Sequence, residues 1–230
     1  CGGFFMTNLP IFDPRSIPVM AVDTHLPKVS QQAMRPQALA QRFAQSRVWT
    51  PELAGEPRFS SRTAVAASVL VPLVLRENGL TVLLTERTTN LSSHSGQIAF
   101  PGGKADPEDA NPIDTALREA QEEVGLVRRD VDILGSMPIY TTGSAYLVTP
   151  VVGLVNPHYT MKPNPHEVAD VFEVPLAFLM DPANHRHHLM EWAGAQREWF
   201  SMPYTDGTTE HYIWGATAGM LRNLYRFLLD

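Results

Sequence analysis

One segment near the middle of the chain carries the signals for both ends of a helix. Asn111 is a good N-cap, Pro112 fits the first helical position, and Gly125 can adopt the left-handed conformation that ends a helix. Between these ends, apolar residues recur at helical spacing, namely Ile113, Ala116, Leu117, Ala120 and Val124. The sequence therefore predicts an amphipathic helix over 112–124, one face of which has to be buried against the rest of the fold.

The apolar segments around this helix indicate several strands and two further helices. Residues 65–75 are typical of a buried strand broken near Pro72, and Asn78-Gly79 predicts a hairpin turn into a return strand over 80–85. Further strands are expected at 131–137, 146–155 and 168–174, and helices at 175–180 and 216–229. Because strands and helices are mixed along the chain, we expect an α+β fold with a mixed sheet sandwiched between helices in α/β/α layers.

The first quarter of the chain has a different texture. Residues 1–60 are rich in proline and polar residues, and we interpret them as an N-terminal extension ahead of a domain at 61–230. A helix is expected at 37–46, either laid over the main domain with a strand or used in a dimer contact. Met6 is a candidate for the natural start, which would make residues 1–5 an added remnant.

Composition excludes several classes of protein. Cys1 is the only cysteine, so an internal disulfide or a cysteine-based metal site is ruled out, and a reducing cytoplasmic location is expected. With 18 Lys and Arg against 24 Asp and Glu, the formal net charge is -6, which argues against nucleic-acid binding. The longest apolar stretch is too short to span a membrane, and we do not expect the first residues to act as a secretion signal.

The predicted helix carries a cluster of acids. Glu119, Glu122 and Glu123 have i, i+3, i+4 spacing and share one face beside the apolar stripe. Like charges at these spacings weaken a helix, and a divalent cation such as Mg²⁺ would offset the repulsion. A solvated acidic face is an equally good interpretation of the helix alone. Upstream, Gly102-Gly103 would let the backbone approach a ligand closely, so that the Gly103 carbonyl could join a metal shell.

The glycine loop and the Arg118-Glu119-x-x-Glu122-Glu123-x-Gly125 block together resemble the Nudix box, a motif of hydrolases that cleave a diphosphate linked to another moiety. Five residues separate Gly103 from the acid Asp109, and eight separate Asp109 from Arg118, which is one more than in the usual pattern. Residues 83–103 and 213–218 are in turn similar to the corresponding segments of coenzyme A pyrophosphatases. The resemblance spans residues 64–229 and implies a Nudix fold.

This resemblance implies a metal-dependent reaction. Gly103, Glu119, Glu122 and Glu123 would bind Mg²⁺ or Mn²⁺, which would neutralise the diphosphate and activate a water molecule. Arg118 would orient a glutamate through a bidentate pair, unless it makes only a surface salt bridge with Glu122.

The general base is either Glu122 or Glu167, although Glu167 could equally be a solvated loop acid. The resemblance also suggests substrate contacts for a set of residues whose alternative roles are ordinary ion pairs, loop hydrogen bonds or solvent exposure: Arg87, His94, Gln97 and Lys104.

The substrate class follows from the same resemblance. Coenzyme A or acyl-coenzyme A would be split into 3′,5′-ADP and 4′-phosphopantetheine or its acyl derivative. A second hypothesis is a Nudix hydrolase of another nucleoside diphosphate derivative, such as ADP-ribose or a dinucleotide. A third is a non-catalytic nucleotide-binding module. A homodimer is also expected, since many relatives pair.

Overall fold

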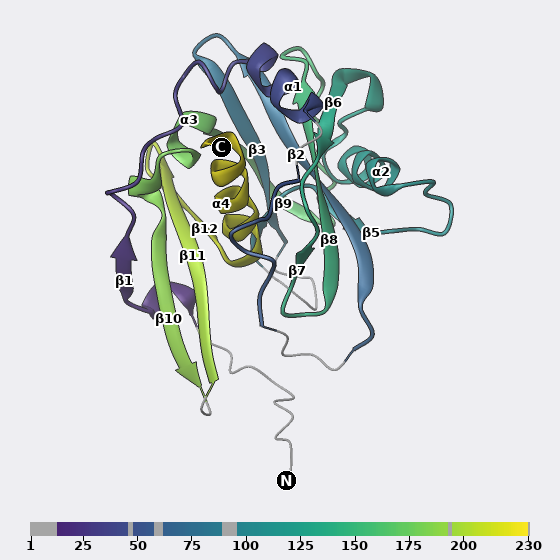
Figure 1. The fold of residues 1–230 in the computed structure, drawn as a ribbon. Helices are drawn as coiled ribbons and strands as arrows, with labels where there is room; N and C mark the ends of the chain where they lie inside the picture. The colour runs from purple at the N-terminus through teal and green to yellow at the C-terminus, as the bar shows by residue number, and fades with distance from the viewer. Residues whose placement is uncertain (1–12, 46–47, 58–61, 89–95, 193–194, 230) are drawn as a thin grey trace.

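A computed structural model describes residues 13–45, 48–57, 62–88, 96–192 and 195–229 of the chain. Two β-sheets lie on either side of the C-terminal helix, and a second long helix covers the outer face of the larger sheet (Figure 1). The mixed sheet with helices on both faces confirms the expected α+β class and its α/β/α layering. The second sheet adds a layer that the sequence analysis did not predict.

The larger sheet is mixed because one parallel pair lies among antiparallel ones. β2 (Val65–Arg76) runs parallel to β8 (Tyr146–Val155), whereas β3 (Gly79–Arg87) pairs antiparallel with β2 and with β9 (Val168–Pro175). The remaining strands are β4 (Ile98–Ala99), β5 (Gly102–Lys104), β6 (Val131–Ser136) and β7 (Tyr140–Thr141). The predicted hairpin between β2 and β3 is confirmed, with Arg76 opposite Gly79 across a loop of residues 77–78.

The expected break at Pro72 is wrong, because β2 continues through it. Leu70 donates its N–H to the Pro101 carbonyl, and strand alternation turns the Pro72 nitrogen toward the same edge. On that edge β5 pairs only with residues 67–69 and β3 only with residues 73–76. Pro72 lies in the interval between these two partners, where the absence of an N–H breaks no ladder hydrogen bond.

The helix predicted at the middle of the chain is α2 (Pro112–Val124), and its caps are as expected. The Asn111 side chain accepts hydrogen bonds from the backbone N–H groups of Ile113 and Asp114, and Gly125 has a φ of 75°. The apolar stripe of α2 packs on one face of the larger sheet, against side chains such as Leu70 and Leu83. This packing turns the neighbouring acidic face of α2 toward the edge of the sheet.

The other helices cover the opposite face and the N-terminal side. α4 (Gly215–Leu229) packs on that opposite face, and the short α3 (Leu176–Leu179) follows β9. α1 (Pro36–Ala44) packs near β6. The described residues also form single turns of 3₁₀-helix, namely η1 (Pro14–Ser16), η2 (Arg128–Asp130) and η3 (Pro182–Asn184).

The smaller sheet is antiparallel and has the strand order β1-β10-β11-β12. Its strands are β1 (Val19–Val22), β10 (Arg186–Trp192), β11 (Ala195–Asp206) and β12 (Thr209–Trp214). Figure 1 shows it on the far side of α4 from the larger sheet. Its sequence is difficult to interpret because buried positions include Ser201, His188 and His211 as well as apolar residues. The pairing of β1 with β10 places part of residues 1–60 inside this layer, while the boundary at residue 60 stays a prediction.

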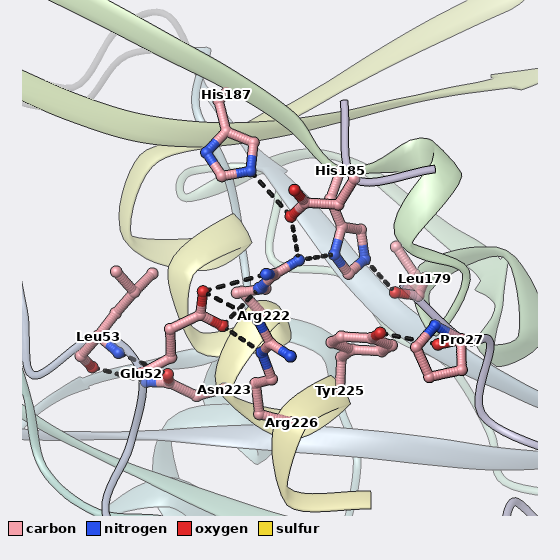
Figure 2. Close-up of polar contacts among 11 residues, drawn as sticks. Pro27, Glu52, Leu53, Leu179, His185, His187, Arg222, Asn223, Tyr225 and Arg226 are labelled. Atoms are coloured by element: carbon pink, nitrogen blue, oxygen red, sulfur yellow. Dashed lines mark hydrogen bonds and ion pairs between the residues drawn. The ribbon is translucent and has the colours of Figure 1, made fainter. Parts of the chain in front are cut away.

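A buried cation ties the N-terminal segment to α4. Arg222 is 1 % exposed, and its guanidinium donates two hydrogen bonds to Glu52, at 2.7 and 3.0 Å (Figure 2). The same group lies 2.7 Å from an Asp23 carboxylate oxygen and 3.0 Å from Nδ1 of His185. Burial raises the pKa of Glu52, but the hydrogen bonds from Arg222 and Arg226 outweigh it and hold that pKa at about 2.

We predict that Arg222→Met lowers the free energy of unfolding by about 3–5 kcal/mol, because Glu52 and Asp23 lose the cation that compensates their burial. Arg226→Met is the matched control, since Arg226 contacts the same Glu52 from a more exposed position. Its expected loss is about 1 kcal/mol or less. Urea unfolding followed by circular dichroism measures both values, and equal losses would contradict the central role of Arg222.

Candidate active site

The three glutamates of α2 have different environments, although they share one helix face. Glu123 points into the fold and is only 3 % exposed, and its Oε2 accepts a hydrogen bond of 3.2 Å from the Gly102 N–H. The Glu119 side chain is 15 % exposed, whereas that of Glu122 is 56 % exposed. The helix therefore presents one buried, one half-buried and one solvent-facing carboxylate along a single edge.

Both glycines of the preceding strand are required by close approach. A Cβ on Gly102 would lie 2.4 Å from the Ser68 carbonyl oxygen of the neighbouring strand β2. A Cβ on Gly103 would lie 2.5 Å from Cδ of Glu119. Because neither glycine has a side chain, the main chain of β5 can pass directly beside the carboxylates of α2. The close approach seen here is to the protein's own groups, and the predicted approach of Gly102-Gly103 to a ligand stays a prediction.

Arg118 connects the loop after β5 to the helix. Its Nε and Nη2 donate to the two carboxylate oxygens of Asp109, at 3.1 and 3.0 Å, and Nη2 also donates to the Lys104 carbonyl. Nη1 donates to Glu119 at 2.9 Å and reaches Glu122 only at 3.4 Å. The expected bidentate pair is thus made with Asp109 instead of a glutamate, and the i,i+4 contact with Glu122 is the weaker one.

Glu167 is brought to the same place by the loop before β9. The backbone N–H groups of Lys162 and Asn164 donate to the carbonyls of Val124 and Glu123, both at 2.8 Å, and so dock this loop on the end of α2. Asn164 then donates a side-chain hydrogen bond of 3.2 Å to Oε1 of Glu167. The loop thereby holds a fourth carboxylate in the electrostatic neighbourhood of Glu119 and Glu123.

Two of these acids, Glu119 and Glu123, have raised pKa values. Burial is the largest cause of the raised pKa of Glu123, which reaches about 7, and the charges of Glu119 and Glu167 add to it. The hydrogen bond from Gly102 and the positive charge of Arg87 oppose this increase without cancelling it. The pKa of Glu119 is also raised, again chiefly by burial. The described cations therefore leave an excess of negative charge at this edge.

The four residues expected to contact substrate lie in different surroundings. Nη1 of Arg87 lies 3.6 Å from Oε1 of Glu123, so this arginine belongs to the carboxylate cluster. Lys104 is exposed at the end of β5. Gln97 lines a separate cavity of about 280 Å³ together with Tyr212 and Trp214. His94 lies outside the described residues.

Asp109 has a structural role that was not predicted from the sequence. Besides pairing with Arg118, its Oδ2 accepts a hydrogen bond of 2.8 Å from the Asp106 N–H. The hydrogen bonds from Arg118 and from Asp106 lower the pKa of Asp109, so it stays charged and fixes the arginine. The signal was available in its spacing, since five residues separate it from Gly103.

Comparison with known proteins gives one family. The model of the NUDIX domain matches residues 65–200. A relative from Photorhabdus laumondii described as "Uncharacterized Nudix hydrolase NudL" is 41% identical over 158 residues, which cover 69% of this chain and 82% of that protein. The protein of the same description from Yersinia enterocolitica is 39% identical over 169 residues, covering 74% and 84% of the two chains.

Among solved structures, the chain resembles a Nudix hydrolase from M. smegmatis, RenU, with a TM-score of 0.43 and 22% identity over 50% of this chain and 73% of that one. The family model and the close relatives show that the chain belongs to the Nudix hydrolase family, and it is a pyrophosphohydrolase of that family. Members of this family act on small nucleoside diphosphate derivatives and generally use divalent metal ions.

The residues present fit such an ion. The carboxylates of Glu119, Glu123 and Glu167 form an all-oxygen donor set, which hard divalent cations prefer. Their negative charges repel one another and contribute to the raised pKa values of Glu119 and Glu123, and a bound cation would relieve this repulsion. Gly103 leaves room beside Glu119 for the main chain to contribute. Among the described residues, no helix combines the length and apolar character needed to cross a membrane.

Stability in the absence of divalent ions tests the charge excess. The pKa of Glu123 is about 7 in the folded chain against 4.5 ordinarily, so the fold favours the protonated acid. Its contribution to stability is present below about pH 4.5 and is lost as the pH rises through 7. In EDTA, we predict that Glu123→Gln removes this loss and stabilises the chain at pH 8 by up to about 3 kcal/mol.

The measurement is urea unfolding between pH 4 and 8 with wild type, Glu123→Gln and Glu108→Gln. Glu108 is an exposed acid of the same loop region and serves as the control for loss of one negative charge. The prediction fails if wild type and Glu123→Gln show the same dependence on pH.

Proposed function

We propose that the chain hydrolyses the diphosphate bond of coenzyme A or acyl-coenzyme A, with Mg²⁺ or Mn²⁺, to 3′,5′-ADP and 4′-phosphopantetheine or its acyl form. The observation that carries this proposal is the cluster of carboxylates on α2 and Glu167, gathered against the Gly103 main chain. Choice of coenzyme A rests on the resemblance of residues 83–103 and 213–218 to coenzyme A pyrophosphatases.

The proposed metal site consists of Glu119, Glu122, Glu123 and the Gly103 carbonyl. A bound divalent ion would neutralise the diphosphate charge and lower the pKa of a water molecule. Arg118 positions one of these ligands. Its bidentate contact with Asp109 and its hydrogen bond to Glu119 fix the position of that glutamate. Without these contacts, the Glu119 side chain would be free to turn away from the backbone of Gly103.

Two glutamates are candidates for the general base that removes a proton from the attacking water. Glu122 is supported by its exposure, because a solvent-facing carboxylate can release the proton it accepts. Glu167 is supported by its electrostatic coupling to Glu119 and Glu123 and by the Asn164 hydrogen bond, which leaves its second oxygen available. In either case the proton moves from water to a carboxylate oxygen.

The substrate side of the proposal involves Arg87, His94, Gln97 and Lys104. Arg87 is the best placed of the described three, because it lies beside Glu123 and its Nε is buried without a partner among the described residues. A phosphate oxygen would provide that partner. Lys104 offers an exposed ammonium at the end of β5. A homodimer and a cytoplasmic location remain predictions from the sequence.

A substrate panel separates the candidate functions. We predict that the chain releases 3′,5′-ADP from coenzyme A in the presence of Mg²⁺ or Mn²⁺, and that EDTA abolishes the release. Product analysis by chromatography, with ADP-ribose and a dinucleoside polyphosphate as comparison substrates, measures the preference. Turnover of ADP-ribose with no action on coenzyme A would assign another Nudix substrate, and binding of every substrate without turnover would assign a non-catalytic module.

Glutamine variants test the residue roles. We predict that Glu123→Gln lowers kcat by about a hundredfold or more with little loss of folding, because losing ~3 kcal/mol of transition-state stabilisation has that effect. Glu122→Gln and Glu167→Gln distinguish the two candidate bases. Replacing the residue that acts as the base should lower kcat and remove the acidic limb of the pH profile of kcat. Glu108→Gln is the control. Unchanged turnover of Glu123→Gln would overturn the proposed metal assignment.

A further inference from the structure

A second polar cluster lies on the opposite face of the larger sheet from α2. On that face, Val82 of β3 is opposite Val174 of β9, and Leu84 is opposite Phe172. All four are buried in the core that packs against α4. The next pair in the same row is Glu86 opposite Asp170. Two acids placed directly across an antiparallel pair repel each other, so the end of this apolar row needs a compensating charge.

A buried histidine faces this pair from the smaller sheet. His211 of β12 is 5 % exposed, and its ring stacks on Phe172 with a centroid separation of 3.6 Å and an interplanar angle of 12°. Within the described part of the chain, the imidazole of His211 takes part in no hydrogen bond or ion pair. The stacking on Phe172 fixes the plane of the ring, and so the directions in which its two nitrogens point. The imidazole is therefore positioned for a ligand.

The three side chains converge. One ligand atom each from Glu86, Asp170 and His211 lies within 4.8 Å of the other two. We infer that these residues form a second cation site, which binds a divalent transition-metal ion of the zinc type. A mixed set of one imidazole and two carboxylates suits Zn²⁺ better than Mg²⁺ or Ca²⁺, which prefer oxygen ligands alone. Three protein ligands leave a fourth position for water.

The site is separate from the carboxylates of α2. Successive residues of a strand point to opposite faces, so Arg87 turns toward Glu123 and α2, whereas Glu86 turns toward α4 and the smaller sheet. Glu86 also lines the cavity of about 280 Å³ that Gln97 lines, and Asp170 is exposed, so the cluster is open to solvent. An ion bound here would join β3 and β9 of the larger sheet to β12 of the smaller one.

Zinc binding by the full chain tests this inference. Equilibrium dialysis against Zn²⁺, with excess Mg²⁺ present to compete for the all-oxygen carboxylates of α2, should give one more bound zinc per chain in wild type than in Asp170→Asn or His211→Gln. Asp170→Asn is the milder change, because its amide oxygen can still accept the Val171 N–H, as Oδ1 of Asp170 does. Zinc should also raise the Tm of wild type but not of Asp170→Asn.

Two controls make the outcome specific. Glu210→Gln removes a neighbouring acid of the same strand and the same cavity that is outside the cluster, and it should bind zinc as wild type does. Glu123→Gln should retain this zinc while losing turnover. Equal zinc content and equal zinc-dependent Tm in wild type, Asp170→Asn and His211→Gln would overturn the inference, as would an equal loss in Glu210→Gln.

Discussion

The buried guanidinium of Arg222 is the constraint on which the arrangement of the layers depends. A charge with so little exposure is tolerated only if acids accompany it into the interior, and both of its acids, Asp23 and Glu52, come from the N-terminal segment. Nδ1 of His185, the residue just before β10 of the smaller sheet, lies 3.0 Å from Nη1 of the same guanidinium. Consequently α4 can be buried between two sheets only while the N-terminal segment stays in place. Asp23 and Glu52, two described residues of the predicted extension, thus contribute to the interior of the fold.

The carboxylate cluster of α2 also needs opposite charges to compensate its burial, but here the buried charges are negative and the protein's cations compensate them only in part. Arg118 makes its bidentate contact with Asp109, which is not one of the clustered glutamates. Glu119 and Glu123 keep raised pKa values in spite of Arg118 and Arg87. The charge of Arg222 is neutralised by acids of the chain, whereas the negative charge of the α2 carboxylates is not neutralised by its cations. This excess of negative charge is the physical reason why the carboxylate cluster suits a divalent ion, which would in turn attract an anionic substrate.

The parts of the fold that could be predicted from the sequence are those specified locally. The helix over 112–124 carries its own cap, first proline and terminal glycine, and the spacing of its glutamates needs no distant partner. The smaller sheet has no such signal, because His188 and Ser201 satisfy each other only after β10 pairs with β11. Pro72 was misinterpreted for a similar reason, since the gap between β5 and β3 is a property of the assembled sheet. Glu167 could be named but not placed without the docking of its loop on α2.

The end of β3 explains how one strand can serve two polar clusters. A β-bulge interrupts the register between Glu86 and Arg87, where Glu86 is opposite Asp170 but Arg87 is opposite Val168. Alternation sends the two adjacent side chains to opposite faces of the sheet. Arg87 then meets an acid that is already buried, while Glu86 meets another acid and an imidazole with no described partner. The first cluster is partly compensated by protein, and the second depends on a cation from outside.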